Sequence, residues 1–150
     1  MTTGIALGPD DLRIIGHSIN WELNVPYDHS PPPRLSEQEA AALNGLFTDL
    51  CRLNRHCLAG GVDSVLVEVA DPYSVSDDRI RLPALYLTLM TEAVASFLRE
   101  VGHSSTELEV VTGLPWSKTP ELLARLQGVL HEVCGGEATD VGQSPRSSPS

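Results

Sequence analysis

The stretch from Ala84 to Val101 constrains the fold more than any other part of the chain. Apolar side chains recur along it at steps of three and four residues, which places them on one broad face of a helix. This predicted face comprises Leu85, Tyr86, Leu89, Met90, Ala93, Val94, Phe97, Leu98 and Val101. Because a helix of this kind gains its stability from packing, we expect it to be central to the core and covered by other elements.

Three further helices are predicted from recognisable ends. Residues 36–61 open with Ser36 as the N-cap and Glu39 three residues later, which is the capping-box arrangement, and close on two glycines. Residues 9–23 open with a proline and two aspartates, which favour the first turn of a helix. Residues 120–133 carry apolar side chains at helical spacing after a serine or threonine N-cap.

Short strands complete the predicted architecture. Val62–Val69 is rich in β-branched residues and alternates over Val65, Val67 and Val69, which is typical of a strand. Ile5–Leu7, Ile80–Leu82 and Thr106–Val111 are shorter candidates. The predicted fold class is therefore α+β, with a small sheet of about three to four short strands packed with about four helices.

The composition indicates one globular domain over residues 1–134 and a disordered tail over residues 135–150. The chain has 150 residues, the length of one ordinary domain, and 41% of them are hydrophobic. The tail contains one branched aliphatic side chain, Val141, among small, polar and charged residues, too little apolar area to offset the entropy of ordering them. Pro31–Pro33 predicts an extended connector inside the domain.

The two halves of the chain share an apolar pattern. A shift of seventy-five positions lays residues 7–23 over residues 82–98, with Leu7 over Leu82 and Ile19 over Val94. Each half then resembles a strand followed by a helix. Two interpretations are open. One is the duplication of a single unit, and the other is chance, because any two amphipathic helices show matching apolar positions when they are aligned at their best register. Chance is the favoured interpretation, since the polar positions do not match.

Charge and cysteine content disfavour several classes of function. Ten Lys and Arg residues against twenty Asp and Glu residues give a net charge of −10, so an approaching nucleic acid meets repulsion. No apolar run reaches the roughly 18 residues of a bilayer span, and the amino terminus lacks the regions of a signal peptide. Cys51, Cys57 and Cys134 are an odd number at scattered spacing, so we expect reduced thiols in a cytoplasmic protein.

Residue spacing predicts neither a metal site nor a cofactor. The cysteines and histidines show no zinc-ligand spacing, since Cys51 and Cys57 are six apart and face different sides of a helix. Residues 71–78 are rich in oxygen donors, Asp77 and Asp78 among them, but lack the central glycine of a calcium loop. We therefore interpret this segment as an ordinary acidic turn.

Catalytic motifs are also absent from the sequence. It contains no nucleophile elbow, phosphate-binding glycine loop or Cys-His signature. His17 and Asn20 share a predicted helix face near Trp21 and could form a polar cluster in a pocket, but a structural histidine is the favoured interpretation. We expect a protein that is not an enzyme and has no cofactor; an enzyme built around His17 is the least favoured alternative.

Two segments carry a resemblance to small bacterial proteins. Leu12–Leu23, LRIIGHSINWEL, resembles the first helix of a loosely defined group of small uncharacterised bacterial proteins. Leu82–Val101, LPALYLTLMTEAVASFLREV, followed by TELEVVTG, is similar to the strand and helix arrangement of the same group. These proteins are similar in size and acidity to the immunity proteins of toxin systems. The resemblance implies a protein-binding role, with a basic toxin as one form of partner, and carries no catalytic residues.

A third segment carries a different resemblance. Ser105–Leu126, STELEVVTGLPWSKTPELLARL, is similar to the helix-turn-helix of winged-helix transcription regulators, because its TGLP turn supplies a glycine after one helix and a proline for the next. Three departures weigh against DNA reading: Val110 and Val111 favour a strand, a proline falls inside the reading helix, and that helix has two cations. DNA binding through this segment is the alternative function.

The residues expected to bind a partner are Trp116, Asp77, Asp78, Glu107 and Glu109. Trp116 lies in a Pro-Trp-Ser corner, where a large aromatic side chain is either a lid on the core, the favoured interpretation, or an interface anchor. The carboxylates lie near predicted turns and strand ends, where they would attract a basic surface. We therefore expect a non-catalytic, acidic protein-binding module, with immunity or antitoxin-like neutralisation of a basic partner as its sharpest form.

Overall fold

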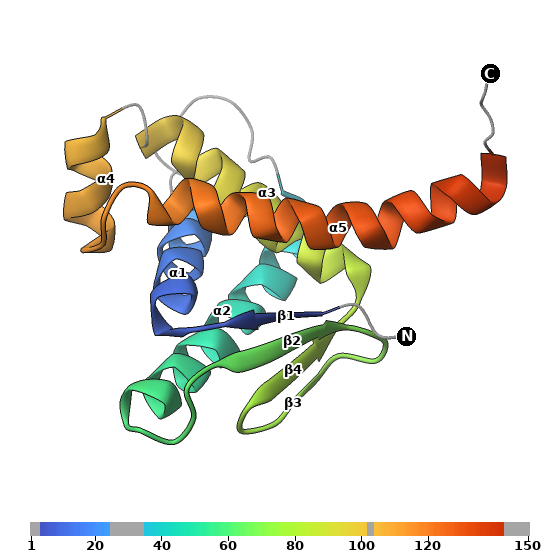
Figure 1. Cartoon of the computed structure of the whole chain (residues 1–150), viewed down its shortest axis with the longest axis horizontal. Helices are drawn as coiled ribbons and strands as arrows, with labels where there is room; N and C mark the ends of the chain where they lie inside the picture. The colour runs from blue at the N-terminus through green and yellow to red at the C-terminus, as the bar shows by residue number, and fades with distance from the viewer. Residues whose placement is uncertain (1–3, 25–34, 102–103, 143–150) are drawn as a thin grey trace.

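The computed structural model describes residues 4–24, 35–101 and 104–142, with the backbone alone for Asn24 and residues 134–142. In this part of the chain, five helices pack with a four-stranded mixed sheet, which confirms the predicted α+β class (Figure 1). One continuous cluster of buried side chains extends from Leu7 in the first strand to Val129 in the last helix. The core therefore includes both halves of the sequence.

The sheet has the strand order β1-β2-β4-β3. β1 (Gly4–Leu7) runs antiparallel to β2 (Val65–Val69), β2 runs parallel to β4 (Arg79–Leu82), and β3 (Ser74–Val75) is antiparallel to β4. The first, second and fourth strands lie in segments predicted as strands, whereas β3 is too short to show an alternating pattern. Alternate strand side chains are buried in the core, namely Leu7, Val65, Val67, Ile80 and Leu82.

The free edge of β1 is covered by a side chain from the carboxyl-terminal half. Nη2 of Arg125 donates a hydrogen bond to the backbone oxygen of Ala6 at 2.7 Å, and Nη1 pairs with the carboxylate of Asp11 at 3.1 Å. An edge strand exposes unpaired backbone groups, so this contact both satisfies one of them and joins the last helix to the first strand.

The helices are α1 (Pro9–Asn24), α2 (Glu37–Leu58), α3 (Ala84–Val101), α4 (Ser105–Thr112) and α5 (Lys118–Gly142). The helix α1 packs against α2 and α3, and α3 packs in turn against α5. The predicted central helix is confirmed with the same first and last residues. Its position between α1, α5 and the sheet explains why several of its side chains have no exposed surface, namely Leu87, Met90, Ala93, Val94 and Phe97.

The buried face of α3 differs from the predicted face at its first turn. Leu85, placed on the buried face from the sequence, is 53% exposed, whereas Leu87 is fully buried. Because α3 is covered on two sides by helices, its buried surface also includes Thr91 and Ser96. The hydroxyl group of Thr91 donates to the backbone oxygen of Leu87 at 2.7 Å, so burial leaves it no unsatisfied donor.

The predicted ends of α2 are confirmed. The side chain of Ser36 accepts from the backbone N–H of Glu39, and the side chain of Glu39 accepts from the backbone N–H of Ser36, which completes the capping box. Gly60, just past the helix, has a φ of +87°, a conformation that favours glycine. Local sequence thus determines where this helix begins and ends.

The prediction of a strand at Thr106–Val111 is wrong, because these residues form the helix α4. The side chain of Ser104 accepts from the backbone N–H of Glu107 at the start, and Gly113, at φ +73°, ends the helix. Both caps satisfy backbone groups locally, so the segment needs no partner strand. The strand preference of Val110 and Val111 is too small to overcome them.

The last helix is longer than predicted. The sequence places its end at Val133 before two glycines, but α5 continues through them to Gly142, so this predicted end is wrong. Glycine lowers helix propensity by about 1 kcal/mol without removing a backbone donor, so it does not end a helix as proline does. The expected tail, residues 135–150, therefore begins inside α5, and its residues 143–150 lie outside the described residues.

The shift of seventy-five positions found in the sequence relates observed elements. It lays Gly4–Leu7 onto Arg79–Leu82 and the start of α1 onto the start of α3. Paired positions are buried alike, including Leu12 with Leu87 and Ile19 with Val94. Since β1 is antiparallel to β2 and β4 is parallel to it, the two strands run in opposite directions on either side of β2, as a pseudo-twofold axis normal to the sheet requires.

Candidate functional site

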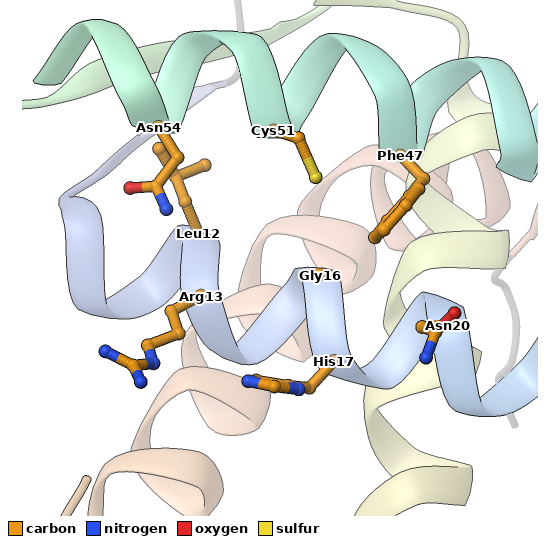
Figure 2. A pocket seen from close by; sticks show the side chains of 8 residues that line it. All are labelled: Leu12, Arg13, Gly16, His17, Asn20, Phe47, Cys51 and Asn54. Carbon is orange, nitrogen blue, oxygen red and sulfur yellow. The ribbon is translucent and has the colours of Figure 1, made fainter. Parts of the chain in front are cut away.

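A pocket of about 360 Å³ opens between α1 and α2. Figure 2 shows its lining, with side chains of α2 pointing toward α1 across the cavity. The lining residues are Leu12, Arg13, Gly16, His17, Asn20, Phe47, Cys51 and Asn54. Its volume lies within the range of about 300–1,000 Å³ that is usual for small-molecule sites.

The pocket forms where α1 and α2 pack together around Gly16, and its lining residues have the same spacing along both helices. Its polar lining on α1 falls at residues 13, 17 and 20, and its lining on α2 falls at residues 47, 51 and 54, both at helical steps of four and three. Gly16 lies between these rows, and a Cβ atom there would be 3.8 Å from Cε1 of Phe47. The space that a larger side chain would fill at position 16 therefore remains open.

Burial shifts the pKa values of His17 and Cys51 in this lining toward their uncharged forms. Loss of solvation lowers the pKa of His17, and the neighbouring guanidinium of Arg13 lowers it further, which favours the neutral imidazole. Burial raises the pKa of the Cys51 thiol, against a smaller opposing effect of Arg55, so the thiol stays protonated. The lining can thus donate and accept hydrogen bonds but presents no thiolate nucleophile.

Arg13 is the charged residue of the lining, and none of the described residues that line the pocket is a carboxylate. The local charge is therefore positive in a chain whose net charge is −10. Arg13 is exposed, and its guanidinium lies against Gly113, where a Cβ atom would be 2.9 Å from Nη2. Such a group, held at the rim of a cavity, can pair with an anion through two parallel hydrogen bonds.

Asn54 supplies an unsatisfied acceptor to the same pocket. Its side-chain oxygen, Oδ1, is buried and accepts no hydrogen bond from any described group. Figure 2 shows its amide pointing toward α1 above Leu12 and Arg13. A buried polar atom without a partner costs about 1–3 kcal/mol, so a ligand with an N–H or O–H donor would recover this energy.

The corner between α4 and α5 contains three of the residues predicted to bind a partner. Glu107 and Glu109 lie exposed on α4, and the backbone N–H of Trp116 donates to Oε2 of Glu109 at 2.9 Å. Trp116 is 41% exposed and Val110 is 77% exposed, with Val111 also exposed beside it. Exposed apolar side chains and carboxylates thus occur together on α4 and in the turn after it, and the partner-binding role of Trp116 stays a prediction.

We name this surface the α4 corner and define it as Glu107, Glu109, Val110, Val111 and Trp116. A shallow hollow of about 330 Å³ adjoins it, lined by Glu109, Gly113, Leu114 and Pro115. The left-handed conformation of Gly113 turns the chain here, which is why Trp116 folds back toward α4.

The structure does not bring the other two predicted residues to this corner. Asp77 and Asp78 lie exposed in the turn between β3 and β4. Figure 1 shows that turn at the lower edge of the molecule, beside β3, and α4 at the upper left, on the other side of α1. The five predicted residues therefore form two separate acidic regions instead of one surface.

Other candidates from the sequence have structural roles. Trp21 packs edge-on against Phe97, with ring centroids 6.1 Å apart, and belongs to a second buried cluster instead of the pocket around His17. Among the described side chains, no group of three His, Cys, Asp or Glu residues is placed to hold a metal ion. Within the same part of the chain, no helix combines the length and apolar content of a bilayer span.

Sequence reasoning found two residues of the pocket and missed the rest. His17 and Asn20 were identified as sharing a helix face, whereas Arg13, Phe47 and Asn54 were not connected with them. The signal was present in the equal spacing of the two lining rows and in a glycine inside an amphipathic helix, which costs about 1 kcal/mol and often marks a close approach or a cavity. What the sequence lacked was the packing of α1 against α2.

Comparison of the chain with protein-family models, with curated proteins and with solved structures found no match.

Proposed function

We propose that this protein is a non-catalytic binding module that recognises a basic protein through the α4 corner. The observation that carries this proposal is the exposure of Val110, Val111 and Trp116 in the same short segment as the exposed carboxylates of Glu107 and Glu109. Large exposed apolar side chains have a cost in water, and burying them against a partner recovers it. Tryptophan is among the residues that carry most of the energy at interfaces.

The charge of the molecule supports a basic partner. With a net charge of −10, the protein attracts cationic surfaces over long range, and the carboxylates of the α4 corner would orient such a surface on arrival. Asp77 and Asp78 lie too far from this corner to share a small interface, so their contribution would be to long-range attraction alone. Neutralisation of a basic toxin, as by an immunity protein, is the sharpest form of this function.

The experiment identifies the partner by affinity capture and then measures binding kinetics with purified proteins. Trp116→Ala and Val110→Ala should increase the dissociation rate about tenfold or more, because both remove apolar contact from the interface. Leu58→Ala is the matched control, since Leu58 is 71% exposed at the end of α2, away from the α4 corner. Equal effects of Val110→Ala and Leu58→Ala would contradict the proposal.

A salt titration separates the two roles assigned to charge. Asp77→Lys combined with Asp78→Lys should slow association several-fold at low salt and leave the dissociation rate unchanged. Near 0.5 M salt, where the Debye length is about 4 Å, this difference should vanish. A changed dissociation rate would instead place the β3–β4 turn inside the interface.

DNA binding through residues 105–126 remains the alternative function. It is favoured by the order of α4, a turn and α5, which is the order that the winged-helix resemblance implies. The charge weighs against it, because Arg125 is occupied by Asp11 and Ala6, and Glu121 is exposed in the first turn of α5. Retention on heparin at low salt would support this alternative, whereas elution in the flow-through would support the protein-binding proposal.

A further inference from the structure

We propose that the pocket between α1 and α2 is a binding site for a small organic carboxylate that also bears a hydroxyl or N–H donor. Three features of the pocket carry this inference independently of the proposed protein-binding function. They are the cation in its lining, the buried acceptor on Asn54 and the apolar contact area that Gly16 leaves open.

The charge of the lining selects an anion. Arg13 is exposed and no carboxylate belongs to the described lining, so an anionic group of a ligand can pair with its guanidinium. His17 lies one turn further along α1, and its neutral imidazole can add a hydrogen bond without changing the charge. A carboxylate fits this site better than a phosphate, because a single guanidinium balances a single negative charge.

The wall of the pocket selects a hydrogen-bond donor. Oδ1 of Asn54 is buried and accepts from no described group, and Asn54 lines the same cavity as Arg13 (Figure 2). A ligand whose carboxylate pairs with Arg13 can therefore place an O–H or N–H at Asn54 when the side-chain amide rotates to turn its buried oxygen into the cavity. Asn54 then favours ligands that carry the donor over ligands that lack it, because a ligand without the donor leaves Oδ1 unsatisfied.

The remaining lining selects an apolar body between these two ends. The ring of Phe47 and the side chain of Leu12 face the space above Gly16 (Figure 2). Together with a cavity of about 360 Å³, this describes a compact aromatic or aliphatic acid of about ten to fifteen non-hydrogen atoms. The hydroxyphenylacetates and 3-(hydroxyphenyl)propionates have this size and all three groups.

The test is a titration of the full chain with the ortho, meta and para isomers of these acids, followed by NMR. We expect at least one isomer to shift the backbone signals of Gly16, His17 and Phe47, with a Kd on the order of 0.1–1 mM. The matched probes are the phenyl acid without the hydroxyl group and the neutral carboxamide. Each should bind about tenfold more weakly than the hydroxy acid.

Four variants assign the contributions to residues. Gly16→Leu fills the cavity and should abolish binding, whereas Gly45→Leu, in open space on α2, should preserve it. Arg13→Gln should weaken the acid about tenfold and leave the carboxamide unchanged, and Asn54→Leu should remove the preference for the hydroxyl group. Melting temperatures establish that each variant folds, and Gly16→Ala, whose Cβ makes ordinary contact with Phe47, replaces Gly16→Leu if that variant does not.

Several results would overturn the proposal. One is that no acid at about 5 mM shifts the NMR signals of the lining residues. Another is that Gly16→Leu and Gly45→Leu bind the acids equally well, and a third is that the protein binds acid and carboxamide with equal affinity. Equal affinity for the phenyl and hydroxyphenyl acids would overturn the role of Asn54. None of these results bears on the α4 corner, so the two proposals fail or stand separately.

Discussion

Glycine has two different roles in this chain, inside helices and at their ends. Gly45 lies in the interior of α2 and Gly60 lies just past its end at φ +87°, and neither would bring a Cβ atom within 4 Å of another residue. A new side chain therefore meets no steric crowding at either position. Any difference in stability between the two alanine variants then reflects backbone conformation alone.

We predict that Gly45→Ala raises the free energy of unfolding by about 0.5–1 kcal/mol, because alanine favours the helix and restricts the unfolded chain. Gly60→Ala should lower it by about 1–2 kcal/mol, since a side chain is strained in the left-handed conformation. Urea denaturation of the two variants measures both values. Changes of the same sign would contradict this account of the two glycines.

His17 gives the stability a dependence on pH. Its ordinary pKa is 6.5, and burial followed by the charge of Arg13 lowers the pKa in the folded state. Between the two values the unfolded chain binds more protons than the folded protein, so stability falls as pH is lowered through 6.5 and levels off below the folded pKa.

We predict that His17→Gln makes the stability profile flatter between about pH 7.5 and pH 5, where urea denaturation can be followed. Arg13→Gln should produce a smaller change in the same direction, because it removes the lesser of the two causes. Titration of the His17 imidazole by NMR provides a direct measurement. A folded-state value above 6.5 would reverse the sign and rule out this assignment.

At the scale of the element, α3 shows how packing selects a helix face. Periodicity alone placed Leu85 and Leu89 on one apolar stripe, four residues apart. In the structure, Leu85 is 53% exposed in the first turn, whereas Leu89 is 3% exposed in the core. The same residue type on the same helix therefore has two different environments, which makes the pair a matched test.

We predict that Leu89→Asp unfolds the domain, because an unpaired carboxylate in the core costs several kcal/mol. Leu85→Asp should leave it folded, since the position is exposed and a carboxylate near a helix amino terminus is favourable. Phe97→Asp should behave like Leu89→Asp, and Glu92→Ala should change stability by less than about 0.5 kcal/mol. Circular dichroism during heating distinguishes these outcomes, and a cooperatively folded Leu89→Asp protein would refute the assignment.

The whole molecule is organised as two related halves around β2. In one half β1 leads into α1, and α2 packs on α1; in the other β4 leads into α3, and α5 packs on α3. Three observations agree with a pseudo-twofold arrangement. Strand and helix begin at the same interval in both halves, equivalent positions are buried alike, and β1 and β4 run in opposite directions. The two halves therefore share a spacing, a burial pattern and opposed strand directions, and duplication of one unit stays a prediction.

Truncation tests how far this arrangement depends on the end of the chain. The contribution of α5 to the described core lies between Leu122 and Leu130, before the two glycines. We therefore predict that removing residues 135–150 changes the melting temperature by less than about 2 °C. Differential scanning calorimetry of the shortened chain measures this, and a loss of several degrees would place part of the core beyond residue 134.

By itself, the sequence determined the elements whose signals are local. The ends of α2 and α3, and most of the strands, follow from capping residues, glycines and apolar periodicity, which act within a few residues. The local caps Ser104 and Gly113 account for the helix at Thr106–Val111, whereas the tertiary structure alone decided that Leu85 is exposed and that Asp77 lies apart from Glu107. It also created the pocket, because Arg13 and Asn54 line one cavity only where α1 packs against α2. Such relations depend on which surfaces pack together, and no local pattern in a chain specifies the distance between residues far apart along it.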